Sequence, residues 1–242
     1  GLSALALWVV PGMIDKCAFR PYRLLRDRDY LALLTSGFVH ADIGHLLFNM
    51  FTFYFFAVPL EHRIGTSKFL LLYFAGLLLS QVQSYYKHRS NPEYATLGAS
   101  GAISAVLFAS IVYMPTQSIY IIPIPVPIPA PLFAVAYLAY TYWSAKQARG
   151  RINHDAHLGG ALTGLVFVAL FDPGAYGRWV CSSGGGCGTG RRYAATTSSK
   201  KLSVTALAHV GAAHSALNGS LTPRHAIVSG TLWRVCCSVG RR

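Results

Sequence analysis

Four long uncharged stretches alternate with short charged segments along the chain. They contain 18, 18, 52 and 16 residues and are bracketed by these pairs: Asp42 and Glu61, Lys68 and Lys87, Glu93 and Lys146, and Asp155 and Asp172. A helix that crosses a membrane needs about 20 mostly apolar residues, with a range of about 17–25. The pattern therefore predicts one membrane-spanning helix in each short stretch and two in the long one.

A shorter apolar stretch, residues 1–14, opens the chain. It is too short for a full span, so we interpret it as the carboxyl-terminal part of a first helix whose start is missing; a short interfacial helix is the alternative. We therefore expect an all-α polytopic membrane protein with six transmembrane helices, the first of them truncated. The expected ranges are 1–15, 35–60, 67–86, 97–114, 132–147 and 155–171.

Proline recurs at positions 123, 125, 127, 129 and 131. Proline lacks the amide proton and clashes with the preceding helical turn, so no helix runs through this segment. We expect an extended, polyproline-like connector between the fourth and fifth helices. Because it is apolar and uncharged, we place it at the membrane interface.

The composition agrees with a membrane protein up to about residue 177 and then changes. Only 12% of the residues are charged, about half the share of soluble domains. Residues 178–242 hold nine basic and no acidic residues, without periodicity. We expect a transmembrane domain at 1–177 and a basic, low-complexity, disordered tail at 178–242. Beside membrane spans, anionic lipid headgroups suit such a tail better than nucleic acid, so we expect membrane lipids as partners and no nucleic acid.

Three polar clusters interrupt the apolar pattern: His40, His45 and Asn49; Ser100; and His154 and His157. Helices of a membrane bundle alternate in direction, so the second, fourth and sixth enter from the same face. Each cluster lies within roughly 10 Å of the start of its segment, at 1.5 Å per residue. The three clusters should therefore meet at similar depth. A serine, a histidine and hydrogen-bond donors are the parts of a hydrolytic site with a serine nucleophile.

Small residues near these clusters predict close helix packing. Gly98 and Gly101 flank Ser100, and Gly160 and Gly164 lie on the His157 face of the last helix. A Gly-x3-Gly spacing lets membrane helices approach closely, which would bring His157 to Ser100. Asp155, the nearest acid, lies at the membrane edge, so we expect a catalytic dyad rather than a triad.

At these motifs the chain resembles the rhomboid family of intramembrane serine proteases. The matching patterns are H-x4-H-x3-N (His40, His45, Asn49), G-x-S-G (Gly98 to Gly101) and A-H-x-G-G (Ala156 to Gly160), in the family's order. The resemblance implies Ser100 as nucleophile, His157 as general base, and His45 and Asn49 in the oxyanion hole. His40, Gly98, Gly101, His154, Gly160 and Gly164 would support them.

The resemblance also implies a partner and a location. Transmembrane proteins would be the substrates, and no metal or other cofactor is expected. The six-helix form looks most like bacterial members, which favours the bacterial inner membrane, with the mitochondrial inner membrane as the alternative; the oligomeric state stays open. Two other functions compete: a non-proteolytic relative that binds membrane clients, and a haem or metal carrier using His40, His45, His154 and His157.

Overall fold

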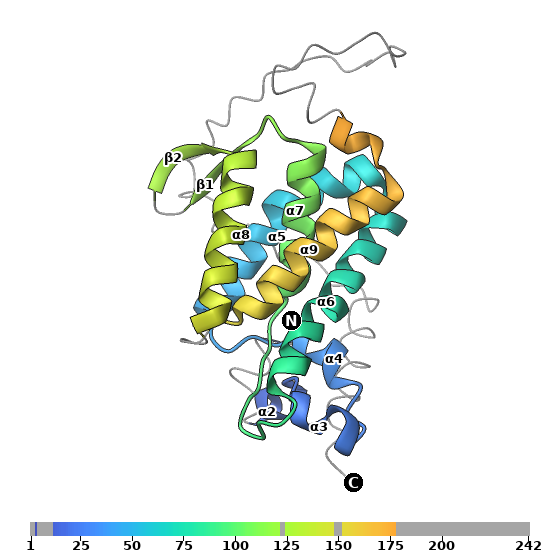
Figure 1. The fold of residues 1–242 in the computed structure, drawn as a ribbon, viewed down its shortest axis with the longest axis vertical. Coiled ribbons are helices and arrows are strands. Elements are labelled where there is room, and N and C mark those ends of the chain that lie inside the picture. Colours follow the sequence, from blue (N-terminus) through green and yellow to red (C-terminus); the bar gives the residue numbers. More distant parts are fainter. Residues whose placement is uncertain (1–2, 4–11, 122–123, 148–151, 178–242) are drawn as a thin grey trace, which may run out of the picture.

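The computed structural model describes residue 3 and residues 12–121, 124–147 and 152–177. This part of the chain is mostly helical (Figure 1). In chain order its elements are α2 (Met13–Cys17), α3 (Pro21–Arg26), α4 (Ala32–Thr35), η1 (Ser36–Phe38), α5 (Ile43–Ile64), α6 (Thr66–His88), α7 (Ser100–Tyr113), β1 (Ser118–Ile121), β2 (Ile124–Pro129), α8 (Ala130–Gln147) and α9 (His154–Phe171).

Helix α7 forms the centre of the bundle. Every residue from Gly101 to Val112 is buried, and α7 packs against α9, α6, α5 and, less closely, α8 (Figure 1). Its 14 residues span roughly 21 Å at 1.5 Å per residue, less than the ~30 Å hydrocarbon core of a bilayer. A helix this short and this enclosed places at least one of its ends below the membrane surface.

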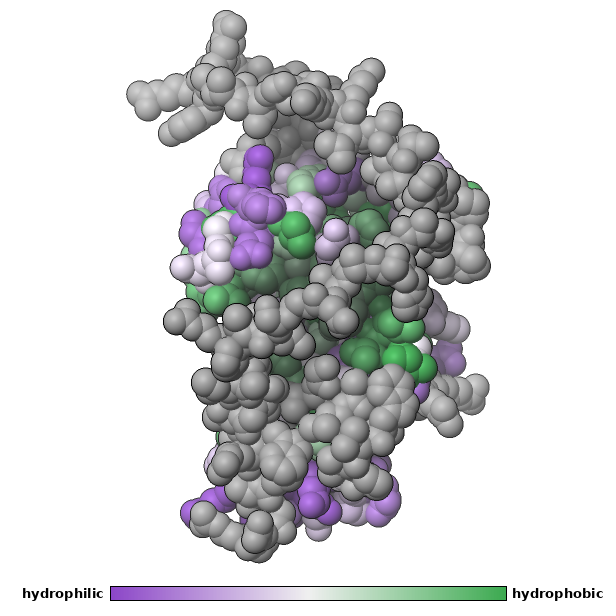
Figure 2. Space-filling view, turned by 180° about the vertical axis from the view of Figure 1, so that it is seen from behind, coloured by the Kyte–Doolittle hydropathy of each residue, from purple (hydrophilic) through white to green (hydrophobic). Residues whose placement is uncertain are grey.

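The outer helices turn apolar side chains outward. On α5, Leu47, Phe48 and Tyr54 are each at least 60% exposed, and only 17% of its most apolar window is buried. Figure 2 shows hydrophobic residues across the middle of one face, with hydrophilic residues toward both ends. A soluble protein rarely exposes so much contiguous apolar surface, so this surface fits contact with lipid.

Two described helices, α5 and α9, are long and apolar enough to cross a membrane. The predicted count of six transmembrane helices is therefore not confirmed, although five helices of at least 14 residues are present in the described ranges. The predicted ranges 67–86, 97–114, 132–147 and 155–171 agree with α6, α7, α8 and α9 to within three residues at each end.

The predicted helix over 35–60 was wrong at its start. Residues 35–42 form the end of α4, the short 3-10 helix η1 and an extended link, and α5 begins only at Ile43. The side chain of Asp42 accepts a hydrogen bond from the backbone N–H of His45 at 2.8 Å, so it caps a new helix. His40 consequently lies before the helix that carries His45 and Asn49.

The proline-rich connector is more ordered than predicted. Instead of a lone extended segment, β2 pairs with β1 as an antiparallel hairpin, with Ile119 opposite Ile128 and Ser118 opposite Pro129. In a strand, alternate residues direct their N–H groups to the same edge. With proline at every second position, the intervening residues still supply N–H groups to β1, and the outer edge is left without donors.

Most of the predicted first helix, 1–15, lies outside the described residues, and so does all of the predicted disordered tail, 178–242. Of the former, Met13 to Asp15 belong to the short helix α2, which follows Gly12 in a left-handed conformation, φ +82°.

The close contact between α7 and α9 requires a glycine at position 164, so a larger residue there should lower the stability of the protein. A β-carbon on Gly164 would overlap the backbone carbonyl of Ala105, whereas one on Gly177 would meet no atom within 4 Å. Overpacking of this kind costs about 1–3 kcal/mol. Gly164→Ala should therefore lower stability to unfolding in mixed detergent micelles by that amount, and Gly177→Ala should not. Equal stability of the two variants would contradict this close contact.

Candidate active site

The amino-terminal ends of α5, α7 and α9 gather at one end of the bundle (Figure 1). Ser100 is the first residue of α7, and His154 is the first and His157 the fourth residue of α9. His45 is the third residue of α5, and Asn49 follows one turn later on the same face. The elements thus bring the three sequence clusters to a common level.

Helices α7 and α9 touch through backbone. A β-carbon on Gly160 would overlap the carbonyl oxygen of Gly101, and one on Gly101 would meet the side chain of Ser80 and the carbonyl of Ala156. Gly101 follows Ser100 and Ala156 precedes His157, so these contacts hold the nucleophile candidate and the base candidate on adjoining helix ends.

Gly98 creates the space for His45 next to Ser100. Its φ of +108° is a conformation that side-chain-bearing residues rarely adopt. A β-carbon there would lie 2.6 Å from Cε1 of His45. The N–H of Gly98 donates to the carbonyl of Ser36 at 2.8 Å, which fixes this link against the segment before α5.

His40 lies behind His45 rather than on the same helix. The two rings meet edge to face with centroids 5.0 Å apart, and Nδ1 of His40 is 2.8 Å from the hydroxyl of Ser3. The Ser3 hydroxyl donates to the carbonyl of Phe38 at 3.0 Å. The imidazole of His40 is therefore anchored through its Nδ1, and its Nε2 is on the opposite edge of the ring. The structure thus places His40 beside His45, the residue predicted to contribute to the oxyanion hole.

Polar atoms without partners gather at this end of the bundle. Nδ2 of Asn49, Nε2 of His40 and Nδ1 of His154 are buried and have no hydrogen-bond partner among the described residues. An unsatisfied buried polar group costs about 1–3 kcal/mol, so such groups commonly mark a place where a ligand binds. Asn49, only 3% exposed, offers a donor of the kind that an oxyanion requires.

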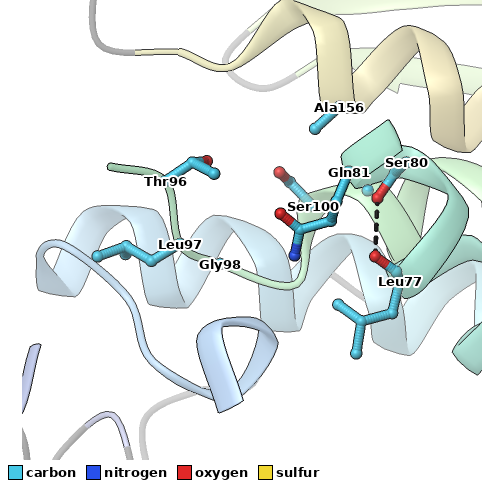
Figure 3. Close-up of a pocket in the computed structure, with 9 residues that line it drawn as sticks. Leu77, Ser80, Gln81, Thr96, Leu97, Gly98, Ser100 and Ala156 are labelled. Carbon is cyan, nitrogen blue, oxygen red and sulfur yellow. Dashed lines mark hydrogen bonds between the residues drawn. The ribbon is translucent and has the colours of Figure 1, made fainter. Parts of the chain in front are cut away.

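A small cavity of about 10 Å³ adjoins Ser100. It is lined by Leu77, Ser80, Gln81, Thr96, Leu97, Gly98, Ser100, Gly101 and Ala156. Figure 3 shows the side chains of Ser100 and Gln81 directed into the same space. Nε2 of Gln81 donates to the hydroxyl of Ser36 at 3.1 Å, while its Oε1 has no partner in the described part. The cavity is polar and about the size that one water molecule needs.

The ring of His157 lies between two others. The ring of Tyr137, on α8, stacks with it at 6.4 Å and 20°, and the ring of His154 meets it edge to face at 6.1 Å. The hydroxyl of Tyr137 is 3.2 Å from that of Ser104, which fixes the tyrosine to α7. No hydrogen bond joins Ser100 to His157 among the described residues; catalytic contacts are commonly longer before substrate binds.

Asp155 is engaged away from His157. Its carboxylate pairs with Lys87 at 3.1 Å, accepts from Gln83 at 3.0 Å and lies 3.8 Å from His88. The carboxylate thus joins α9 to the end of α6. Since this acid is occupied, the arrangement around His157 suits a dyad. Among the described residues, no group of three or more His, Cys, Asp or Glu side chains is arranged to hold a metal ion.

The sequence interpretation missed Tyr137, Gln81 and Asn153. Gln81 had a signal, since it is a polar residue inside the uncharged stretch 69–86. Asn153 had one as well, because asparagine directly before an apolar run is a typical helix cap. Tyr137 had none, because α8 carries several aromatic residues and the pattern does not distinguish the one that faces His157.

The comparisons with known proteins agree with the motifs. The Rhomboid domain profile matches residues 27–173. RHOMBOID-like protein 12, mitochondrial, of Arabidopsis thaliana is 30% identical over 162 residues, which are 60% of this chain and 47% of that protein. Rhomboid protein 1, mitochondrial, of Saccharomyces cerevisiae is 29% identical over 183 residues, 69% of this chain and 49% of that protein.

A human relative, presenilin-associated rhomboid-like protein, mitochondrial, is 30% identical over 143 residues, 56% of this chain and 36% of that protein. The chain thus spans about half the length or less of these curated relatives. The match does not extend to their remaining segments.

The space between Gly98 and His45 generates a second prediction. Gly98→Ala combines an unfavourable φ, worth about 1–3 kcal/mol, with a collision against the imidazole. Gly12→Ala is the matched control, because Gly12 has φ +82° but nothing within 4 Å of a β-carbon. Thermal unfolding in detergent should show a larger loss for Gly98→Ala. A loss no larger than that of the control would mean that His45 moves aside freely.

Proposed function

Because the chain belongs to the rhomboid family, we propose that it is an intramembrane serine endopeptidase that cleaves the transmembrane segments of other membrane proteins. The observation that carries the proposal is the backbone contact between Gly101 and Gly160, which holds the helix ends of Ser100 and His157 together. Ser100 is the nucleophile and His157 the general base.

In the first half of the reaction, Nε2 or Nδ1 of His157 takes the proton of Ser100 as its oxygen attacks the scissile carbonyl. The carbonyl oxygen becomes an oxyanion. Three donors are available to it: Nδ2 of Asn49, which lacks a partner among the described residues, the imidazole of His45, and the N–H of Ser100 at the start of α7. His157 then gives the proton to the leaving amine, and an ester with Ser100 remains.

In the second half, water must reach that ester from within a largely apolar bundle. The cavity beside Ser100 has room for one water molecule, and Oε1 of Gln81, which has no partner among the described residues, can accept a hydrogen bond from it. His157 removes a proton from the attacking water and passes it to Oγ of Ser100 as the acid product leaves. The cavity thus suits a reservoir for the hydrolytic step.

The ring of Tyr137 orients the imidazole of His157, the role that a third residue plays in a catalytic triad. Tyr137 stacks on one face of the ring, and the hydroxyl of Tyr137 lies 3.2 Å from that of Ser104. Stacking restricts the rotation of the ring without adding charge. We propose that these ring contacts, rather than a carboxylate, orient His157, since Asp155 is engaged by Lys87.

We also propose the mitochondrial inner membrane as the location, because three relatives bear mitochondrial names. The expectation of a bacterial inner membrane has no support from these relatives. Transmembrane proteins are the proposed substrates, since the exposed apolar side chains of α5 offer a surface on which an apolar helix can pack.

The direct test uses the full chain in proteoliposomes with a fluorogenic transmembrane substrate. The wild type should cleave it and react with a fluorophosphonate probe. Ser100→Ala should lose both, with turnover reduced on the order of 10⁴-fold or more, and Ser110→Ala serves as the matched control, because Ser110 lies ten residues further along α7. If the wild type binds the substrate without cleaving it, the chain is instead the non-proteolytic, client-binding relative.

Alanine substitutions of the two histidines of α9 should reduce turnover by different amounts. His157→Ala should match Ser100→Ala, because a general base must reach the nucleophile. His154→Ala should retain activity within about tenfold, equal to about 1.4 kcal/mol, since His154 is at the helix start and packs edge to face on Tyr140. Turnover numbers measured with the same substrate decide between them. The opposite ranking would make His154 the base.

A further inference from the structure

The side chain of Asn153 joins three segments of the chain. Its Nδ2 donates to the hydroxyl oxygens of Thr96 at 2.9 Å and of Ser84 at 3.0 Å. Its Oδ1 accepts from the backbone N–H of Ala156 at 3.0 Å and so caps α9. One carboxamide thus connects the start of α9, the end of α6 and the segment that leads into α7.

The two residues joined by this hydrogen bond, Thr96 and Asn153, have the same sequence spacing from the two candidate catalytic residues. Thr96 precedes Ser100 by four residues, and Asn153 precedes His157 by four residues. The carbonyl of Asn153 also accepts from the N–H of His157 at 3.2 Å. The hydrogen bond between Thr96 and Asn153 therefore joins the segments that lead to Ser100 and His157.

The residues bonded to Thr96 and Asn153 are held in place by backbone hydrogen bonds and by burial. The N–H of Thr96 donates to the carbonyl of Phe19 at 2.9 Å, and the N–H of Phe19 donates to the carbonyl of Thr96 at 2.8 Å. Phe19 and Ser84 are fully buried. Burial also raises the pKa of the neighbouring Tyr94 above the usual value of a tyrosine. Asn153 and Thr96 are themselves half-buried, so their hydrogen bonds are partly shielded from water.

We infer that Asn153 is a positioning residue whose hydrogen bond to Thr96 sets the alignment of Ser100 with His157. The inference rests on the proposed proteolytic function. Figure 3 places Thr96 on the segment that runs through Gly98 to Ser100, so a displacement of Thr96 is passed to the nucleophile. A misplacement of 1 Å at a reacting centre can cost on the order of 10²-fold in rate.

Asn153 could instead serve only as a helix cap, and one substitution separates the two roles. Serine caps helices about as well as asparagine, but it has no amide to donate to Thr96 and Ser84. Asn153→Ser therefore keeps the cap and removes the bridge, whereas Asn153→Ala removes both. Thr96→Ala removes the bridge from its other end, and Thr96→Ser retains the hydroxyl.

The experiment measures kcat, KM and the unfolding temperature of the full-length variants in proteoliposomes. Thr163→Val is the matched control, because Thr163 donates only to Gly159 within α9. We expect Asn153→Ser and Thr96→Ala to unfold near the wild-type temperature and to lose about tenfold to 10²-fold in kcat, with KM within about twofold. Thr96→Ser and Thr163→Val should retain wild-type kcat. The double variant Asn153→Ser/Thr96→Ala should be no slower than the slower single variant, since each single variant already removes the hydrogen bond between residues 153 and 96.

Wild-type kcat in Asn153→Ser would overturn the inference and leave Asn153 as a cap. Multiplied losses in the double variant would also overturn it, because the two side chains would then act separately. An inactive wild type with an unreactive Ser100 would instead contradict the proposed function, so the two failures are distinguishable.

Discussion

The contact of α9 with α7 through glycine is the constraint on which the rest of the structure depends. Any side chain at Gly160 or Gly164 would overlap a backbone carbonyl of α7. Lipid offers no hydrophobic drive for helix association, so close backbone packing has to supply the attraction between such helices. The same contact that stabilises the core of the bundle thus also brings the segment of His157 to that of Ser100.

Around this contact, the polar groups divide into those that are paired and those that are not. Asp155, Lys87 and Asn153 are held by hydrogen bonds and ion pairs that tie α6, α8 and α9 together. Asn49, His40 and Gln81 each keep a buried atom without a partner in the described part of the chain. The paired groups hold the site in place at low cost, and the unpaired ones are available to a substrate or water.

The sequence predicted most of the helices and the convergence of the three polar clusters, because both follow from charge spacing and helix direction. It failed where a local interaction outweighed the pattern. Asp42 caps α5 and separates His40 from the helix, and the alternating prolines of β2 leave N–H groups that pair with β1. The contacts of Tyr137 and Asn153 could not be predicted, because each depends on the rotation of one helix against another rather than on spacing along the chain.

A structure of the protein after reaction with a fluorophosphonate would test the central claim most directly. The account predicts phosphorus bonded to Oγ of Ser100, with its free oxygen 2.7–3.1 Å from Nδ2 of Asn49 or from the imidazole of His45, the range typical of oxyanion donors. An adduct on another side chain, or one on Ser100 whose oxygen leaves Asn49 and His45 without a partner, would contradict it.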